Sequence, residues 1–213
     1  MIVSCVLRQS PVFGPTHVAW LAEQCSRFLP EWDFLPFSDV PVAGQHVRLT
    51  SDLPSWWSKM EIMRADLPGP VLILDLDLVI LRPWTTTAEQ LSHSYVMRHP
   101  TRDGCLYPEQ FNCAIMLTTP DFRAKASAHF KPEHMDECVG DDQIYYKRYF
   151  DKELRRFQDE WPDEFVSYKL HVKQHGLRPD NTFINFHGLP RPWDLSEPWI
   201  PCLHPAEPSQ ADD

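Results

Sequence analysis

Two aspartates, Asp75 and Asp77, interrupt an apolar stretch, and their spacing points more directly to chemistry than any other pair in the sequence. Residues 71–74 and 78–81 on either side are continuously apolar, which is typical of buried strands. In an extended strand, side chains two positions apart project from one face, so both carboxylates would lie together while Leu76 packs the other way. A divalent cation is the partner that engages both carboxylates at once. The pair therefore predicts a metal site that neutralises a departing nucleoside diphosphate. The structural alternative is a pair of solvated turn carboxylates or a salt-bridged strand end.

His187 is the third expected metal ligand. It follows a predicted late strand at residues 182–186 and precedes a proline-rich turn that carries Arg191 and Trp193. A neutral imidazole beside two carboxylates gives a mixed nitrogen and oxygen donor set, which suits Mn²⁺ better than Mg²⁺. An isolated histidine is more often structural than metal-bound. Arg191, four residues after His187, favours the interpretation of His187 as a metal ligand. We therefore expect the two aspartates and His187 to hold Mn²⁺, with Mg²⁺ as the alternative.

Two cations and one aromatic residue stand where a phosphorylated sugar would bind. Lys59 lies on a predicted helix ahead of the aspartates, from which it would reach the donor. A surface lysine without a role in binding is an equally good interpretation. Arg8 follows the first strand, and ligands of open α/β sheets gather at the carboxyl ends of strands. Large aromatic residues are more often part of a core, so of Trp56, Trp57 and Trp193 only Trp193 is expected to stack on a sugar.

The elements that would position these residues alternate between strands and helices. Apolar runs and their breakers predict strands at residues 2–7, 71–74, 78–81, 95–99, 113–117 and 182–186, short strand pieces within 33–49, and helices at 17–28, 55–65, 122–130 and 142–150. This alternation predicts the α/β class. A chain of 213 residues with 43% hydrophobic content supports one core. We expect one domain at residues 1–204 and a flexible tail at 205–213.

The composition argues against several classes of protein. There are 20 lysines and arginines against 30 aspartates and glutamates, a net charge of −10, which argues against a non-specific grip on nucleic acid. No apolar run reaches the roughly 18 to 20 residues of a membrane-spanning helix, although peripheral membrane contact stays open. The six cysteines form no CxxC pair, and the first residues lack the pattern of a signal peptide. We expect reduced, structural cysteines and a cytoplasmic protein.

The motifs and their order resemble the retaining GT-A glycosyltransferases related to glycogenin and to the bacterial lipopolysaccharide galactosyltransferases, over residues 1–194. The resemblance implies a single Rossmann-like GT-A domain with a mixed, mostly parallel sheet flanked by helices. It also implies transfer of a sugar from a nucleotide-diphosphate-sugar donor, with a UDP-sugar favoured, to an acceptor hydroxyl with retention of stereochemistry. Compact phage-encoded and bacterial relatives look similar, so the expected location is the cytosol of a bacterium or of a phage-infected host.

The same resemblance assigns roles to individual residues. Leu7 and Arg8, at the end of the first strand, would contact the nucleotide, and Lys59, Asp75 and Leu76 would contact the donor. Asn112 in FNCAIML would lie near the transferred sugar. Asp142 and Gln143 in GDDQ would form the catalytic pair beside the reacting centre. Arg191 and Trp193 would contact the donor. Arg191 stands where the family has a lysine at a longer distance from the histidine, and a guanidinium still clamps a diphosphate. Ala114 stands where glycine is usual, which would narrow the sugar pocket.

Several alternatives stay open at this stage. Asn112 would otherwise be a polar group at a strand edge, and Asp142 would otherwise cap a helix. The segment DLDLVI also fits a haloacid dehalogenase-like phosphatase that uses Asp75 as nucleophile with Mg²⁺, although that leaves His187 without a role. A non-catalytic sugar-binding module would bind its ligand without turnover. The acceptor (a glycan, a lipid-linked saccharide, a protein or a modified nucleobase) and the oligomeric state are not indicated by the sequence.

Overall fold

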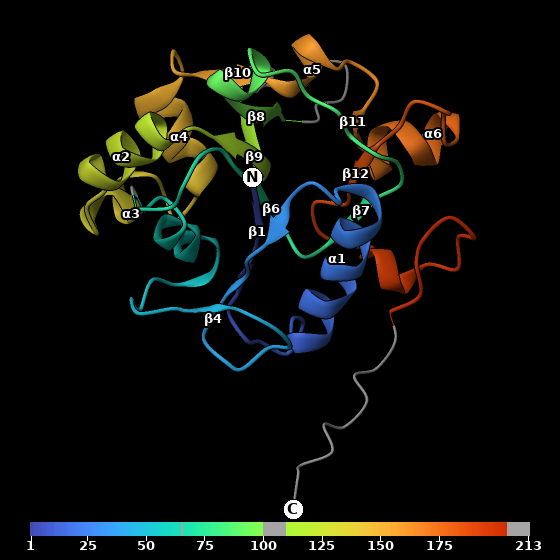
Figure 1. Cartoon of the computed structure of the whole chain (residues 1–213), viewed down its shortest axis with the longest axis horizontal. Coiled ribbons are helices and arrows are strands. Elements are labelled where there is room, and N and C mark those ends of the chain that lie inside the picture. Colours follow the sequence, from blue (N-terminus) through green and yellow to red (C-terminus); the bar gives the residue numbers. More distant parts are fainter. Residues whose placement is uncertain (65, 100–109, 204–213) are drawn as a thin grey trace, which may run out of the picture.

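A six-stranded sheet forms the centre of the computed structural model, which describes residues 1–64, 66–99 and 110–203 (Figure 1). In spatial order its strands are β10 (Leu154–Arg156), β8 (Ser94–Arg98), β9 (Phe111–Thr118), β6 (Val71–Leu74), β1 (Ile2–Ser4) and β3 (Asp33–Phe34). Strand β9 runs antiparallel to both neighbours, and the other three pairs are parallel. The α/β class and the mixed, mostly parallel sheet are therefore confirmed. The expected tail at 205–213 and Cys105 lie outside the described residues.

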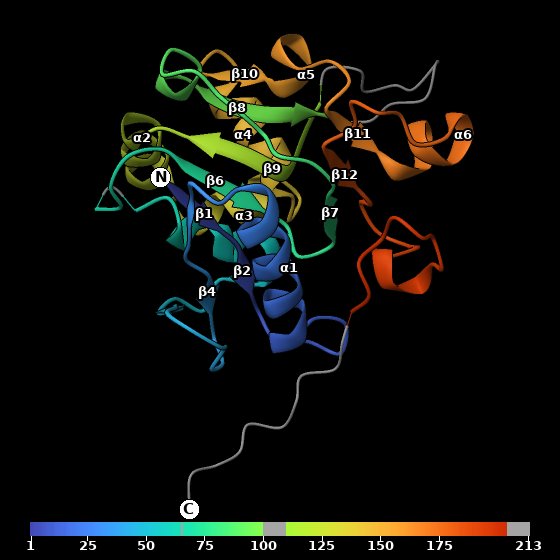
Figure 2. The same cartoon turned by 45° about the vertical axis from the view of Figure 1, so that its right-hand side comes forward.

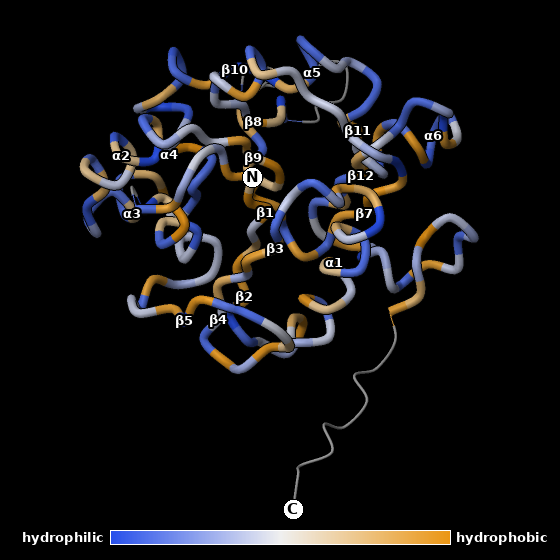
Figure 3. The backbone as a smooth tube through the Cα atoms, viewed as in Figure 1, coloured by the Kyte–Doolittle hydropathy of each residue, from blue (hydrophilic) through white to orange (hydrophobic). Residues whose placement is uncertain are grey.

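Both faces of this sheet are apolar, because the central strands are buried on both sides. In β6, Val71 and Ile73 belong to one core cluster while Leu72 and Leu74 belong to another, as the alternation of side chains along a strand requires. Figure 3 shows hydrophobic residues concentrated along these central strands. The helices that cover the sheet are α1 (Pro15–Phe28) on one face and α2 (Pro120–His129), α3 (Glu133–Glu137) and α4 (Asp142–Phe150) on the other (Figure 2).

Two three-stranded sheets extend the central one. The first contains β2 (Val6–Leu7), β4 (Phe37–Ser38) and β5 (Val47–Arg48), and the second contains β7 (Leu78–Ile80), β11 (Phe165–Ser167) and β12 (Phe183–Asn185). The strand expected at 2–7 is thus divided between two sheets. Strand β12 pairs antiparallel with β7, with Asn185 opposite Leu78. This register brings the residues just before β7 beside those just after β12, which are far apart in the sequence.

The two aspartates lie in a turn, and the expectation that they occupy an extended strand was wrong. Strand β6 ends at Leu74, and the Asp75 backbone N–H donates to the Ala114 carbonyl at 2.8 Å. The chain then turns through Leu76 and Asp77 before β7 begins in the other sheet. The interruption of the apolar run therefore marks the place where the chain changes sheets, at the carboxyl end of β6.

The helix expected at 55–65 is a 3₁₀ helix, η1 (Ser55–Glu61). Its first residue, Ser55, has a left-handed backbone with φ of 50°. The indole N–H groups of Trp56 and Trp57 both donate to the carbonyl of Gly140, at 2.6 and 3.0 Å. Consecutive side chains of an α-helix do not face the same way. The contact of both indoles with one carbonyl therefore goes with the tighter 3₁₀ winding of η1.

Several short elements were not expected from the sequence. They are η2 (Gln90–Ser92), η3 (Tyr168–Val172), η4 (Pro192–Asp194), α3, α5 (Phe157–Glu160), α6 (Lys173–His175), β10 and β11. Elements of three to five residues carry too little periodicity to be recognised, and their partners in the fold determine them. Across the described residues, no helix combines the length and apolarity that crossing a membrane requires.

Candidate functional site

A cavity of about 820 Å³ opens where the three sheets meet. It lies at the carboxyl ends of β2, β6 and β12 and beside the first residues of η1 and α4, the edge at which open α/β sheets bind ligands. Most residues predicted to bind metal, donor or acceptor border it: Arg8, Lys59, Asp75, Leu76, Asp77, Asn112, Asp142, Gln143, His187 and Arg191. The fold therefore gathers ten of the twelve predicted site residues around one space.

Lys59 links two carboxylates on one wall of the cavity. Its side-chain nitrogen lies 2.7 Å from Asp75 Oδ1 and 3.7 Å from Asp142 Oδ2, and it donates to the Cys113 carbonyl at 2.9 Å. Lys59 is only 7% exposed. Burial alone would lower its pKa, but Asp75 and Asp142 raise the pKa above its usual value. The wall thus carries one buried, protonated ammonium shared by two acids.

Asp142 faces the cavity because its neighbour Asp141 caps the helix. The Asp141 side chain accepts from the Gln143 backbone N–H at 2.8 Å at the start of α4, leaving Asp142 directed inward and 4% exposed. Burial raises the pKa of Asp142 to about 6, against the opposing effect of Lys59 and with a further contribution from Asp75. This carboxyl group is therefore protonated more easily than an ordinary aspartate and is still mostly ionised at neutral pH.

Four buried polar atoms of this cavity have no hydrogen-bond partner within the described part of the chain. They are His99 Nδ1, Asp142 Oδ2, Gln143 Oε1 and Arg191 Nε, and of these Asp142 Oδ2 lies 3.7 Å from the Lys59 ammonium. Buried polar atoms in folded proteins are nearly always hydrogen-bonded, and such exceptions cluster where a ligand supplies the partner. These four atoms are therefore available to a bound molecule.

On the opposite wall, Arg191 forms an ion pair with Asp77. Asp77 is buried, and Arg191 lies in the turn after β12, where its backbone N–H donates to Asp194 Oδ2 at 2.8 Å. The guanidinium also lies over the Phe13 ring, 5.1 Å from its centroid. The antiparallel β7–β12 pair explains how residues 114 positions apart meet here.

His187 is held as a neutral imidazole. Burial is the main cause that lowers its pKa to about 4, and the nearby charges of Lys169 and His99 contribute to the same shift. The Nε2 atom shares a 2.7 Å hydrogen bond with Ser167 Oγ, and the His187 carbonyl accepts from Lys169 Nζ at 3.0 Å. The neutral ring is the form that binds a metal ion.

The three expected metal donors border the same cavity but are not arranged as a closed site. Asp75 is paired with Lys59, Asp77 with Arg191, and His187 with Ser167. Among residues 1–64, 66–99 and 110–203, no three histidine, cysteine, aspartate or glutamate side chains stand in positions that could hold one ion. Two carboxylates and a neutral imidazole fit Mn²⁺ as donor types. To bind it together, Asp77 and His187 must exchange their present partners.

Arg8 and Asn112 have structural partners as well as a place at the cavity. Arg8 Nε donates to the Leu53 carbonyl at 3.0 Å and to Ser58 Oγ at 2.9 Å, so it fixes the chain ahead of η1. Asn112 Oδ1 accepts from Asn185 Nδ2 at 2.8 Å, which joins β9 to β12. Both side chains therefore help to build the walls that they line.

Leu7 and Trp193 do not border the cavity, so the structure does not place these two predicted contacts at the site. Leu7 is fully buried in the core. Trp193 packs edge-on against His17, with ring centroids 4.4 Å apart, and against Trp20. Trp56 borders the cavity instead and is 50% exposed. The feature of the sequence that could have identified Trp56 as a cavity residue is its position three residues before Lys59.

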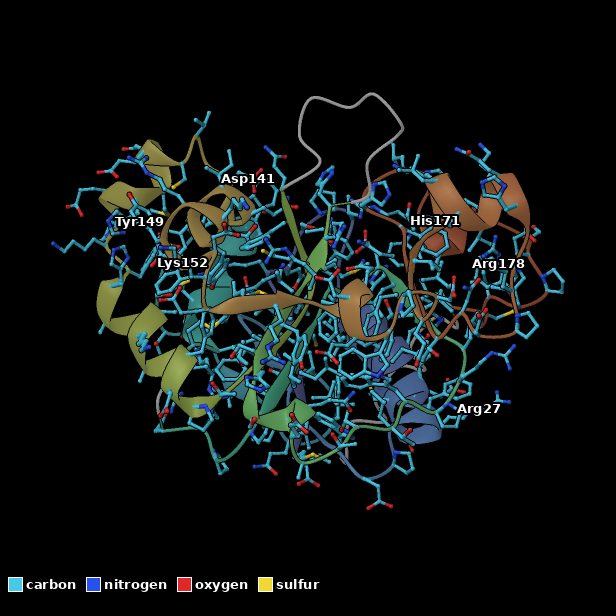
Figure 4. All side chains as sticks on the ribbon, turned by 90° about the horizontal axis from the view of Figure 1, so that it is seen from above. Arg27, Asp141, Tyr149, Lys152, His171 and Arg178 are labelled. Carbon is cyan, nitrogen blue, oxygen red and sulfur yellow. The ribbon has the colours of Figure 1, made fainter. Side chains whose placement is uncertain are left out.

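A smaller cavity of about 270 Å³ adjoins the large one, and His99 borders both. His171 and Arg178 line the smaller cavity, and Figure 4 shows them across the central strands from Asp141, which marks the start of α4. Sequence reasoning did not single out His99.

Solved structures of glycosyltransferases share the fold of this chain. The chain matches the glycosyltransferase GlyE of Streptococcus pneumoniae TIGR4 with a TM-score of 0.61 and 13% identity, over 90% of this chain and 56% of that one. It matches LgtC, a galactosyltransferase solved with donor and acceptor sugar analogues, with a TM-score of 0.58 and 12% identity, over 91% and 89% of the two chains. The chain has a GT-A glycosyltransferase fold.

A third match is a glycosyltransferase involved in glycosylation of the major capsid of PBCV-1, with a TM-score of 0.57 and 12% identity over 88% of this chain and 94% of that one. The chain thus spans about half the length of GlyE and most of the other two. No protein-family model and no curated protein matches its sequence. At these identities the likeness establishes the GT-A fold, and the chemistry is argued from the side chains around the cavity.

Proposed function

We propose that this protein is a metal-dependent glycosyltransferase. It takes a sugar from a nucleotide-diphosphate-sugar donor, with a UDP-sugar favoured, and transfers it to an acceptor hydroxyl with retention, in the cytosol. The observation that carries the proposal is that two charged groups line one cavity of a GT-A fold. One is Lys59 with Asp75 and Asp142, and the other is the Asp77–Arg191 ion pair. This arrangement offers positive and negative groups at the edge of the sheet where phosphorylated ligands bind.

Arg191 is suited to the diphosphate of the donor. A guanidinium binds phosphate oxygens through two parallel hydrogen bonds, and Arg191 Nε has no present partner among the described residues. Asp75, Asp77 and His187 would hold Mn²⁺, which supplies Lewis acidity to the departing phosphate when it is bound. Asp77 would then exchange its guanidinium partner for the metal ion, leaving Arg191 to the donor.

Asp142 and Gln143 line the face where the acceptor and the anomeric carbon would meet. Their buried oxygens Asp142 Oδ2 and Gln143 Oε1, which have no hydrogen-bond partner among the described residues, would accept hydrogen bonds from hydroxyl groups of the sugar and of the acceptor. Lys59 holds Asp142 in place and keeps a positive charge next to the donor. A carboxyl with a pKa of about 6 is ionised at neutral pH and can accept the hydrogen bond of an attacking hydroxyl.

The test is the thermal unfolding of the protein with UDP-glucose, UDP-galactose and UDP-N-acetylglucosamine, each with and without Mn²⁺. A ligand at about one hundred times its Kd adds roughly 2.7 kcal/mol to the free energy of unfolding, which raises the Tm by about 5 to 10 °C. We expect such a rise only with Mn²⁺, and its loss in Asp77→Asn. The control is Asp159→Asn, at an exposed site outside the cavity.

Three outcomes contradict the proposal in different ways. If no nucleotide sugar shifts the Tm in a manganese-dependent manner, the donor assignment is wrong. Hydrolysis of a phosphate monoester with Mg²⁺ that depends on Asp75 would establish the phosphatase alternative. Binding of a UDP-sugar with neither hydrolysis nor transfer would establish a sugar-binding module.

A further inference from the structure

Trp56 stands at the mouth of the cavity with half of its surface exposed, while Trp57 beside it is 2% exposed. Trp57 packs against Phe130 and Tyr145, with ring centroids 5.6 and 5.8 Å away. Trp57 therefore belongs to the core. Trp56 keeps a large apolar surface in contact with water at a place where a ligand would enter.

The backbone around Trp56 is strained in a way that fixes the indole. Its N–H donates to the Gly140 carbonyl at 2.6 Å. Ser55 on one side of this contact and Val139 on the other both have left-handed backbones, with φ of 50° and 54°. Such conformations cost free energy in non-glycine residues and persist only where surrounding contacts impose them. The indole is thus a positioned group, and its orientation does not depend on a ligand.

Hydrogen-bond acceptors lie directly beyond this contact. Gly140 precedes the start of α4, where the buried oxygens Asp142 Oδ2 and Gln143 Oε1 have no hydrogen-bond partner in the part of the chain that is described. A half-exposed indole that lines the same cavity as these two acceptor oxygens matches a pyranose, whose C–H face packs on an aromatic ring while its hydroxyl edge donates hydrogen bonds.

The charged side chains that line the cavity beside Trp56 argue against a nucleic acid as the molecule that packs there. Among the described residues, its three arginine and lysine side chains face three aspartates, and Lys59 and Arg191 are ion-paired with all three aspartates. This lining has no excess of positive charge to hold the phosphates on either side of a stacked base. A neutral sugar ring needs none.

We infer that the exposed face of Trp56, with Asp142 Oδ2 and Gln143 Oε1, forms an acceptor subsite for a pyranose ring, and that the acceptor is a saccharide. This inference rests on the proposed function, because an acceptor exists only for a transferase. It selects the carbohydrate among the acceptor classes that the sequence left open. It also makes Trp56 a residue that determines acceptor specificity.

The experiment measures saturation-transfer NMR from the protein, with UDP and Mn²⁺ present, to lactose, maltose and cellobiose, and also to a decathymidylate and a serine-rich peptide. We expect at least one disaccharide to bind through its C–H protons and Trp56→Ala to weaken that binding about tenfold. Trp56→Phe keeps a ring face and should lose less. Asp159→Asn, at an exposed site outside the cavity lining, should bind as the wild type does.

Saccharide binding that is unchanged in Trp56→Ala overturns the inference, and so does the absence of binding to every saccharide. Binding of only the oligonucleotide or the peptide in a Trp56-dependent way overturns it in favour of that acceptor class. The Tm rise with UDP and Mn²⁺ separates this failure from failure of the proposed function. If the rise is present, only the acceptor subsite is wrong; if the rise is absent, the transferase assignment is wrong as well.

Discussion

The ammonium group of Lys59 is the only cation within 4 Å of the buried Asp142 carboxylate in the described structure. It also contacts Asp75 at 2.7 Å, so two acids depend on one side chain. Removing one partner of a buried ion pair leaves an uncompensated charge, which costs far more than the net contribution of the intact pair. The stability of the protein and the charge of the cavity are therefore coupled at this residue.

Replacing Lys59 by methionine, which has a similar shape without charge, should lower the free energy of unfolding by about 3 to 5 kcal/mol. The measurement is urea unfolding at neutral pH. Lys147→Met is the matched control, because Lys147 pairs with Asp151 on the helix surface and its loss should cost less than about 0.5 kcal/mol. Equal effects of the two substitutions would show that Lys59 does not balance buried charge.

At the scale of single residues, the sequence predicts which side chains gather at one cavity better than it predicts their geometry. The spacing of Asp75 and Asp77 and the late His187 point to residues that do meet at one cavity. The sequence does not distinguish an exposed tryptophan from a buried one, because the partners of Trp57, such as Tyr145, follow it by more than 70 positions. For that reason the sequence favours Trp193, whereas the structure places Trp56 at the cavity.

Among the elements, η1 is attached to the preceding loop through a single carboxylate. Glu61, its last residue, accepts hydrogen bonds from the backbone N–H groups of Thr50 and Ser51, at 2.8 Å each, and from both hydroxyls. Burial raises the pKa of Glu61, but these hydrogen bonds outweigh it and leave the pKa below the usual value of 4.5. The same loop holds Arg8 through the Ser51 carbonyl, so Glu61 supports the cavity wall.

Glu61→Gln should therefore destabilise the protein in a pH-dependent manner. Because the folded pKa lies below the unfolded one, the stabilisation by Glu61 is fully present above about pH 4.5 and is lost as the pH falls through the folded value. We expect the variant to lose about 1 kcal/mol at neutral pH and to approach the wild type in acid. Urea midpoints over this pH range measure the difference, with the exposed Glu23→Gln as control. A difference that does not change with pH would contradict this assignment.

Helix α2 contributes a different support, since Arg123 is fully buried. Its guanidinium donates to the carbonyls of Thr118, Leu67 and Gly69 at 2.7 to 2.9 Å, which ties the helix to the chain that enters β6. Buried carbonyls that lose their donor cost free energy individually. Arg123 thus fixes the strand that leads to the two aspartates.

Arg123→Met should cost about 3 kcal/mol or more in the free energy of unfolding, because at least three buried carbonyls lose their donor. Arg98→Met is the matched control, since Arg98 pairs with Asp159 at the surface and should cost less than about 1 kcal/mol. Chemical denaturation of both variants provides the comparison. A loss at Arg123 no larger than at Arg98 would contradict a structural role for these hydrogen bonds.

Strands with long apolar runs are predictable from the sequence, and elements defined by distant partners are not. Strand β6 and helix α4 occur where the pattern of residues predicts them. The turn at Asp75 and Asp77 was missed because β6 and β7 pair with different sheets, a fact that depends on β9 and β12 far along the chain. The 3₁₀ geometry of η1 likewise accompanies the contact with Gly140.

For the whole molecule, the strand order is the property that the sequence did not predict. The central sheet places β9 between β6 and β8 and ends with β10, an order set by long-range pairing. Glycosyltransferases with 11 to 13% identity to this chain have the same fold. Few individual residues are shared at that level, so the common requirement is the alternation of buried strands with covering helices. The cavity is then defined by whichever side chains stand at the shared edge.

One tryptophan joins distant parts of this architecture. Trp84 lies in the core in contact with the rings of Trp32, Phe157, Trp161, Phe165 and Phe183, at centroid distances of 5.3 to 6.1 Å. These residues come from the turn before β3, from α5 and the residue after it, and from β11 and β12, so the cluster connects distant parts of the chain. Within the described residues, the buried Trp84 Nε1 has no hydrogen-bond partner.

Trp84→Ala should therefore lower the stability of the entire molecule by about 3 to 5 kcal/mol, or roughly 10 °C in Tm, in one cooperative transition. Trp84→Phe should cost much less, because it keeps most of the ring contacts and removes the unpaired N–H. Trp56→Ala is the control of the same residue type at a half-exposed position, where the loss of the hydrogen bond to Gly140 should cost about 1 kcal/mol. Circular dichroism and tryptophan fluorescence should give coincident transitions in all three variants. Separate transitions in Trp84→Ala would show that the central sheet and the β11–β12 sheet unfold independently, and the cavity between them would then be a junction of two units.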